Sequence, residues 1–272
     1  MLYFSVALYP EAAPVIKRFS MKPAGGRLGS LYRSEDALLV LTGSGLLAAS
    51  AALSEALTLF PPSSDDILIN LGICGAPEGF GRQGEWFRIS KITDAGTGRD
   101  FYPELLFTSP LREATLRTVA ASEASPVTLT DMEAASVFQT AQAFFPPERM
   151  LIYKGISDFG IEAGGRLDAA SVTESVATVL PFVLSEAEAV SSLPKETASL
   201  SAETEQAVAE FSKRIDASAS MEHEIRLLAV YRTYRSGDAA EVIMAFCAGI
   251  PEPVTRREGK KLLEQFRDNC LS

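Results

Sequence analysis

Short aliphatic runs recur along the first part of the chain, and each is followed by a turn and a helical pattern. A strand that reads as one apolar run belongs in a sheet that is covered on both faces. Between the runs, apolar residues at three- and four-residue intervals predict the helices that supply this cover. The strand runs lie at residues 2–8, 37–41, 67–71, 85–94 and 150–156, and the helical patterns at 11–19, 46–60, 133–144 and 172–190. The alternation predicts an α/β protein.

The character of the sequence changes near residue 194. Beyond it the strand-like runs stop, and a linker rich in Ser, Thr and Ala leads into four short amphipathic helical patterns. The last pattern begins at Thr255, which forms a Thr-x-x-Glu capping box with Glu258. We therefore expect two parts, an α/β domain at residues 1–194 and an all-helical C-terminal extension at residues 195–272.

The acidic composition restricts both partners and chemistry. The 272 residues carry a formal net charge of −10, whereas a sequence-independent hold on nucleic acid needs clustered Lys and Arg. We expect no nucleic-acid partner. The single histidine, His223, removes most zinc, haem and Ser-His-Asp interpretations. Acid–base chemistry must then depend on carboxylates, and we expect neither a metal nor a cofactor.

Cysteine use and hydropathy indicate a cytoplasmic location. Cys74, Cys247 and Cys270 are an odd number without Cys-x-x-Cys spacing, which favours reduced thiols. The apolar first residues follow no basic segment and lead into Tyr9-Pro10-Glu11, so they predict a strand and not a signal peptide. No apolar run reaches the roughly 18 residues of a membrane span, and we expect no membrane contact.

Three glycine-containing turns follow predicted strands. Ligands of open α/β sheets bind at the carboxyl ends of strands, where glycine lets the backbone approach a ligand closely. None of the turns has the spacing of a Rossmann fingerprint or a P-loop, and each alone is also explained as an ordinary turn. The turns are Thr42-Gly43-Ser44-Gly45, Gly72-Ile73-Cys74-Gly75-Ala76 and Gly155-Ile156-Ser157-Asp158-Phe159.

Five segments in a fixed order are more specific than any one turn. They are the first strand ending at Tyr9-Pro10-Glu11, LTGSGLLAASAAL (41–53), INLGICGAPEG (69–79), TDMEAASV (130–137) and YKGISDFG (153–160). With these segments, residues 1–190 resemble the nucleoside phosphorylase and nucleosidase family, in particular its methylthioadenosine/S-adenosylhomocysteine nucleosidase branch. The resemblance implies a three-layer α/β/α fold with a central twisted mixed sheet. It also implies hydrolysis of the N-glycosidic bond of a purine nucleoside by a homodimer or higher homo-oligomer.

The same resemblance assigns roles to individual residues. Asp158, beside Ser157, would protonate the purine as the general acid, and Glu133 with Met132 would hold the ribose. Glu11 would activate the attacking water. The backbone of the second glycine turn would line the pocket. The substrate-binding residues implied are Glu133, Met132, Ser157, Phe159, Gly75, Cys74, Ile73, Ser44 and Gly45.

Each of the three carboxylates also has a purely structural explanation. Ser157-Asp158 would serve as a helix or turn cap. Thr130-x-x-Glu133 is a capping box for the following helix. Glu11, next to Pro10, would lie in the first turn of a helix, where the helix dipole favours an acid.

The choice of nucleophile separates the enzymatic alternatives. Phosphorylases of the family hold phosphate with arginines and a serine, whereas this sequence has Glu11, Asn70 and Ile73 at those places. A dianion there would be poorly compensated, so water is the expected nucleophile. Arg82, Arg88 and Arg99 leave a phosphate-dependent phosphorylase as one alternative. A nucleoside-binding or regulatory protein without turnover is the other.

Overall fold

The predicted strand runs form the middle of one ten-stranded sheet. The structure is a computed structural model that describes residues 1–121, 127–160, 167–192, 200–250 and 255–271. The strands are β1 (Leu2–Val6), β2 (Lys22–Gly25), β3 (Ser30–Arg33), β4 (Ala37–Leu41), β5 (Ile67–Gly75), β6 (Trp86–Asp94), β7 (Asp100–Phe101), β8 (Arg112–Thr118), β9 (Leu129–Asp131) and β10 (Met150–Asp158).

The sheet is mixed, and part of it closes on itself. Strand β1 lies between β4 and β5 and is parallel to both, and β10 runs parallel to β5 on the far side. Strand β10 also pairs antiparallel with β6, while β8 and β9 connect β6 back to β5. Strands β5, β10, β6, β8 and β9 therefore form a closed ring beside the open part of the sheet.

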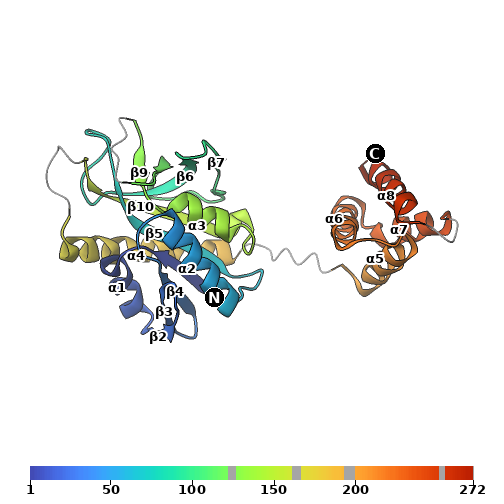
Figure 1. Cartoon of the computed structure of the whole chain (residues 1–272), viewed down its shortest axis with the longest axis horizontal. Coiled ribbons are helices and arrows are strands. Elements are labelled where there is room, and N and C mark those ends of the chain that lie inside the picture. Colours follow the sequence, from blue (N-terminus) through green and yellow to red (C-terminus); the bar gives the residue numbers. More distant parts are fainter. Residues whose placement is uncertain (122–126, 161–166, 193–199, 251–254, 272) are drawn as a thin grey trace. The chain divides into compact units, whose positions relative to one another are not determined.

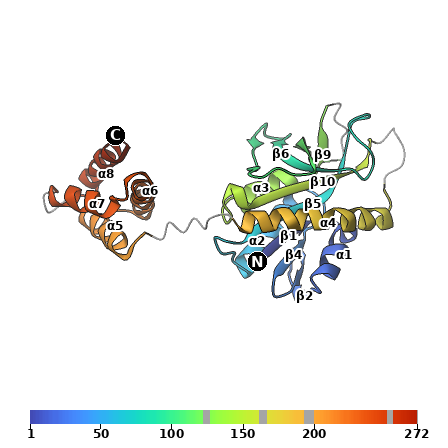
Figure 2. The ribbon, with the colours of Figure 1, turned by 180° about the vertical axis from the view of Figure 1, so that it is seen from behind.

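Helices cover both faces of the sheet (Figures 1 and 2). Along β1, alternate side chains serve the two cores, since Tyr3 belongs to one apolar cluster and Phe4 and Val6 to the other. The first cluster includes residues of α2 (Leu46–Leu59) and α3 (Ala134–Ala141), and the second includes residues of α1 (Tyr9–Arg18) and α4 (Ala169–Ser191). The protein thus has the expected three-layer α/β/α fold.

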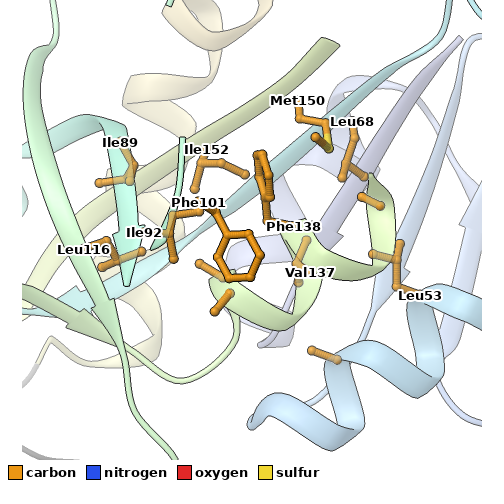
Figure 3. Close-up of a cluster of buried hydrophobic side chains, with 14 of the residues drawn as sticks. Leu53, Leu68, Ile89, Ile92, Phe101, Leu116, Val137, Phe138, Met150 and Ile152 are labelled. Atoms are coloured by element: carbon orange, nitrogen blue, oxygen red, sulfur yellow. The ribbon is translucent and has the colours of Figure 1, made fainter. Parts of the chain in front are cut away.

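The first apolar cluster extends into the closed ring of strands. Phe101 of β7 packs against Phe138 of α3, with ring centroids 5.6 Å apart. Figure 3 shows these two rings together with Ile92 and Leu116 from strands β6 and β8. The core therefore fixes the strands that lead to β9 and α3, where the Asp-Met-Glu motif lies.

Four short strands, β2, β3, β7 and β9, and the length of one helix differ from expectation. Strands β2 and β3 contain exposed residues at most positions, so they lack the apolar pattern that marked the central strands. They pair as an antiparallel hairpin at the edge of the sheet. Helix α3 is shorter than the predicted 133–144 and is capped by Gln142.

The chain divides into two compact units, Met1–Leu193 and Pro194–Ser272. The expected boundary between residues 194 and 195 lies outside the described residues. The second unit is helical, and its core contains Phe211, Phe246 and Phe266 in mutual contact. The predicted capping box forms, because Thr255 N–H donates to Glu258 Oε2 and Glu258 N–H to Thr255 Oγ1. The helices are α5 (Ala202–Arg214), α6 (Ala219–Ser236), α7 (Ala239–Ala248) and α8 (Arg256–Leu271).

None of the helices in the described part of the chain is both long and apolar enough to cross a membrane.

Candidate active site

The candidate site lies where the parallel strands β1, β5 and β10 end side by side. Residue pairing places Gly155 opposite Ile73 and Asp158 opposite Gly75, with a register shift between Ile156 and Asp158. The shift leaves Ser157 as an extra residue in β10. Bulges of this kind redirect side chains and occur next to active sites. The second and third glycine turns of the sequence therefore meet at one carboxyl edge of the sheet.

Glu11 is fixed at this edge by backbone donors from two strand ends. It is 1% exposed and lies in the first turn of α1. Its Oε2 accepts N–H groups from Ala7 at 3.0 Å and Leu8 at 2.8 Å, and its Oε1 accepts the N–H of Ile73 at 2.9 Å. The first-turn explanation of Glu11 is thus realised, but the same carboxylate also reaches across to β5.

A buried lysine, Lys154 of β10, lies beside this carboxylate. Its ammonium pairs with Asp131 Oδ2 at 2.9 Å, and both side chains are almost fully buried. A Cβ atom on Gly72 would lie 3.1 Å from Glu11 Oε1 and 3.4 Å from Lys154 Nζ. Glu11 Oε1 and Lys154 Nζ therefore lie within 6.5 Å of each other, over Gly72, which has no side chain.

Sequence reasoning missed Lys154 and Asp131. The signal was present, because a lysine inside an otherwise apolar strand cannot be buried without a partner of opposite charge. The Asp131 carboxylate also accepts the Thr118 hydroxyl at 2.6 Å and the Ala134 N–H at 2.8 Å. Asp131 thus ties β8, β10 and the start of α3 together.

Glu133 is directed away from the helix that it precedes. Asp131 caps α3, so the capping box predicted between Thr130 and Glu133 as the structural alternative does not form. Instead, Glu133 Oε1 accepts the N–H of Gly45 at 2.8 Å, in the first glycine turn. This contact joins the Asp-Met-Glu segment to the turn that follows β4.

Ser157, Asp158 and the second glycine turn form a connected group. Ser157 Oγ lies 3.1 Å from the Cys74 carbonyl oxygen and 2.6 Å from Asp158 Oδ2. Asp158 Oδ1 accepts the N–H of Gly160 at 3.2 Å, so a local turn cap also exists here. A Cβ on Gly75 would lie 3.4 Å from Asp158 Oδ1, and glycine thus leaves room beside this carboxyl.

Burial and the surrounding charges and hydrogen bonds shift the pKa values of these groups in opposite directions. Burial raises the pKa of Glu11, against the lowering effect of the N–H groups of Ile73 and Leu8. Burial also raises the pKa of Glu133, against the charge of Lys154. For Lys154, burial alone would lower the pKa, but the surrounding carboxylates, led by Asp131, raise it. Lys154 is therefore the positive centre of an acidic site.

Cys74 lies in β5 between Ile73, which bonds to Glu11, and Gly75, which pairs with Asp158. Burial raises the pKa of its thiol, which also senses the charges of Lys154, Asp131 and Asp158. The thiol is free and buried, as are those of Cys247 and Cys270. A thiol held neutral in this way is a poor nucleophile, so the carboxylates are the groups here that are suited to acid–base chemistry.

The remaining predicted residues lie around this centre with fewer contacts. Met132 is half-buried and Ser44 is exposed at the first glycine turn. Phe159 packs at the margin of the first apolar cluster. Among the candidate phosphate ligands, Arg88 is buried and bonds to Glu186 of α4 and to the carbonyl of Phe107, so its guanidinium is already engaged.

No group of three or more His, Cys, Asp or Glu side chains with metal-binding geometry occurs in the described ranges. The acidic residues of the site are instead arranged around Lys154 and around backbone N–H groups.

Comparison with solved structures identifies the fold. The chain matches a 5′-methylthioadenosine nucleosidase from Arabidopsis thaliana in its apo form, with a TM-score of 0.56 and 20% identity, over 71% of this chain and 96% of that one. The Neisseria meningitidis 5′-methylthioadenosine/S-adenosylhomocysteine nucleosidase, in complex with methylthio-immucillin-A, gives a TM-score of 0.55 and 18% identity. This match covers 71% of this chain and 99% of that one. The Campylobacter jejuni 5′-methylthioadenosine/S-adenosylhomocysteine nucleosidase gives a TM-score of 0.55 and 16% identity, over 69% of this chain and 98% of that one.

These matches show the fold, an α/β fold shared with these nucleosidases. Within it, the chain resembles the methylthioadenosine/S-adenosylhomocysteine nucleosidases of several species. The first compact unit makes up 193 of 272 residues, or 71%, the same share that two of the matches cover. The sequence matches no protein-family model and no curated protein.

Proposed function

We propose that this chain hydrolyses the N-glycosidic bond of a purine nucleoside, as a methylthioadenosine/S-adenosylhomocysteine nucleosidase does. The observation that carries the proposal is the convergence of Glu11, Glu133 and the Ser157–Asp158 pair at one edge of the sheet. Cleavage of this bond places positive charge on the sugar and negative charge on the base. The carboxylates of the site stabilise the positive charge on the sugar, and a protonated carboxyl neutralises the negative charge on the base.

Asp158 is the proposed general acid. The hydroxyl of Ser157 has one proton, but its oxygen lies within hydrogen-bonding distance of two acceptors, the Cys74 carbonyl and Asp158 Oδ2. Together with the N–H of Gly160, the Ser157 hydroxyl holds the Asp158 carboxyl in one orientation beside the second glycine turn. In the proposed reaction Asp158 donates a proton to the base nitrogen as the bond breaks.

Glu133 is the proposed ribose ligand. Its Oε1 is fixed by Gly45, and the carboxylate accepts a sugar hydroxyl in the proposed complex. A carboxylate held in this way orients the sugar and stabilises positive charge as it develops at the anomeric carbon. Met132, next to it and half-buried, is the proposed contact with the sugar ring.

Glu11 is the proposed base for water. Two N–H groups occupy its Oε2, but only one bonds to Oε1, so Oε1 retains a lone pair for a water proton. Burial raises the pKa of Glu11, which strengthens it as a base. Water oxygen bonds to the anomeric carbon, its proton passes to Glu11, and the base leaves with the proton of Asp158.

The test is chromatographic detection of free base after incubation of the purified protein with purine nucleosides. The panel contains methylthioadenosine, S-adenosylhomocysteine, adenosine, inosine and futalosine, each with and without phosphate. A Chlamydia trachomatis nucleosidase with this fold is described as bound to MTA, which puts methylthioadenosine first. Free base and free sugar without phosphate are the expected products. Sugar phosphate formed only with phosphate would indicate a phosphorylase, and tight binding without products would indicate a nucleoside-binding protein.

We also propose a homodimer or higher homo-oligomer in the cytoplasm. Tyr102 and Leu106 are 60% and 48% exposed in the segment between β7 and β8, and they offer apolar surface for a second copy. The three buried free cysteines suit a reducing compartment. Light scattering of the purified protein tests the oligomeric state, and fractionation of the source cells tests the cytoplasmic location.

A further inference from the structure

The carbonyl of Ser157 accepts hydrogen bonds from two donors that lie outside the sheet. Ser157 is the extra residue of the bulge in β10, and such a residue has no partner in the strand ladder. The side-chain amide of Gln83 donates to its carbonyl oxygen over 2.7 Å, and the N–H of Leu167 donates to the same oxygen over 3.0 Å. A carbonyl oxygen has two lone pairs, so these two donors engage both of them.

Gln83 extends the pairing of β10 beyond the start of β6. Strand β6 pairs with β10 as far as Gly155. Past that residue, Ile156 N–H donates to the Glu85 carbonyl at 2.9 Å, and Gly84 N–H donates to the Ile156 carbonyl at 2.8 Å. The Gln83 amide then supplies the next donor along β10. A side chain thus continues a ladder that the main chain leaves at this point.

A tight turn holds Gln83 in this position. Glu85 N–H donates to the Arg82 carbonyl at 2.9 Å and closes the four-residue turn Arg82-Gln83-Gly84-Glu85. Gly84 has a φ of +82°, which favours glycine at the third position of a turn. The Glu85 carboxylate accepts the Arg82 N–H at 2.9 Å and pairs with Arg112 of β8 at 3.0 Å. The amide of Gln83 is therefore presented by a turn that is anchored to a neighbouring strand.

We propose that Gln83 is a positioning residue that acts on Asp158 through the carbonyl of Ser157. The proposal rests on the proposed glycosidic cleavage, in which Asp158 is the acid. Asp158 follows Ser157 directly, its carbonyl accepts the Ala76 N–H at 2.9 Å, and its Oδ2 lies 2.6 Å from Ser157 Oγ. A shift of the Ser157 peptide therefore moves the hydroxyl and the carboxyl together. A displacement of about 1 Å slows a reaction by up to about 10²-fold.

Three substitutions separate the donor function of Gln83 from its size. Gln83→Leu removes the donor, and kcat is expected to fall about tenfold while KM stays within about twofold of the wild type. Gln83→Glu places a second acceptor against the Ser157 carbonyl, and kcat is expected to fall at least as far. Gln83→Lys keeps a donor, and kcat is expected to stay within about threefold of the wild type. Because Gln83 is exposed, all three variants should fold, as checked by circular dichroism.

Thr58→Val is the matched control. Thr58 is exposed, and its hydroxyl donates to the Ser54 carbonyl at 2.7 Å. The substitution removes one side-chain donor to a backbone carbonyl, as Gln83→Leu does, but it lies in the last turn of α2, whose first turn follows Gly45 at the site. Its kcat should equal that of the wild type. The urea midpoints of Thr58→Val and Gln83→Leu should lie close together, so that a difference in kcat is not an effect of stability.

Amide hydrogen exchange, measured by NMR, tests the positioning without any turnover. The N–H groups of Leu167 and Ala76 bond to the carbonyls of Ser157 and Asp158, so their exchange reports on the bulge. In Gln83→Leu both should exchange at least about fivefold faster than in the wild type. Amides in β1 and β4, which pair with each other, should exchange at the wild-type rate.

The two measurements separate this proposal from the function on which it rests. Faster exchange and a lower kcat in Gln83→Leu, with kcat retained in Gln83→Lys, would support it. A wild-type kcat in Gln83→Leu would overturn it, and so would a lower kcat with unchanged exchange. If the wild type cleaves no nucleoside, the proposed function fails. Faster exchange in Gln83→Leu would then still show that Gln83 fixes the bulge, and unchanged exchange would refute that as well.

Discussion

Replacement of Lys154 by methionine tests the charge arrangement at the base of the site. The Lys154 ammonium and the Asp131 carboxylate lie 2.9 Å apart, with side chains 2% and 0% exposed. Loss of one partner from a buried pair costs about 3–5 kcal/mol, because the remaining charge is left without compensation. Asp131 keeps its hydrogen bonds from Thr118 and Ala134, so we expect a loss of about 3 kcal/mol, at the lower end.

The assay is urea unfolding followed by tryptophan fluorescence. Trp86 is the only tryptophan, and its ring lies against Gly155, where a Cβ atom would come within 2.6 Å of it. Since Gly155 follows Lys154 in β10, the signal reports the unit and the strand that carry the lysine. The C-terminal helical unit contributes no tryptophan signal.

A double-mutant cycle makes the prediction specific. Lys154→Met and Asp131→Asn together should cost less than the sum of the single changes, with a coupling of about 2 kcal/mol or more. Lys91→Met is the matched control, because its pair with Asp100 is 2.8 Å long but about one-third exposed on both sides, and stability should change little. A loss below about 1 kcal/mol for Lys154→Met, or strict additivity in the cycle, would refute the reasoning.

Three further changes follow from the same geometry. Asp158→Asn should lower kcat by about 10²- to 10⁴-fold with an unchanged circular dichroism spectrum, and an unchanged rate would exclude Asp158 as the acid. Gly72→Ala brings a methyl group to 3.1 Å from Glu11 Oε1 and should reduce kcat by about tenfold in steady-state assays, whereas full activity would place catalysis away from Glu11. Burial raises the pKa of Glu11 and Glu133 above the ordinary value of 4.5, so the folded state binds more protons, and the unfolding free energy should fall as pH rises from 4.5 through the folded-state pKa values. Glu11→Gln should flatten that decline in urea titrations, and an equally steep profile would contradict the assignment.

The sequence by itself determined the order of five apolar strands and four helices of the α/β unit. Runs such as 67–71 and 150–156 are apolar apart from Asn70 and Lys154, and a strand covered on both faces requires such a pattern. The order of glycine turns and carboxylates was equally local, because each motif follows its strand directly. The edge hairpin of β2 and β3 could not be predicted in this way, because Leu31 is its only buried residue and neither strand forms an apolar run.

Only the tertiary structure decided which groups meet. Glu11 and Ile73 are 62 positions apart, and Gly45 and Glu133 are 88 apart, so neither contact leaves a signal in local sequence. The parallel pairing of β1, β5 and β10 brings these distant groups to one edge. Lys154 shows the division most clearly. Its presence in an apolar strand predicts a buried charge. The partner, Asp131, and the neighbour, Glu11, follow only from the fold, because strand order and register determine which side chains share a face.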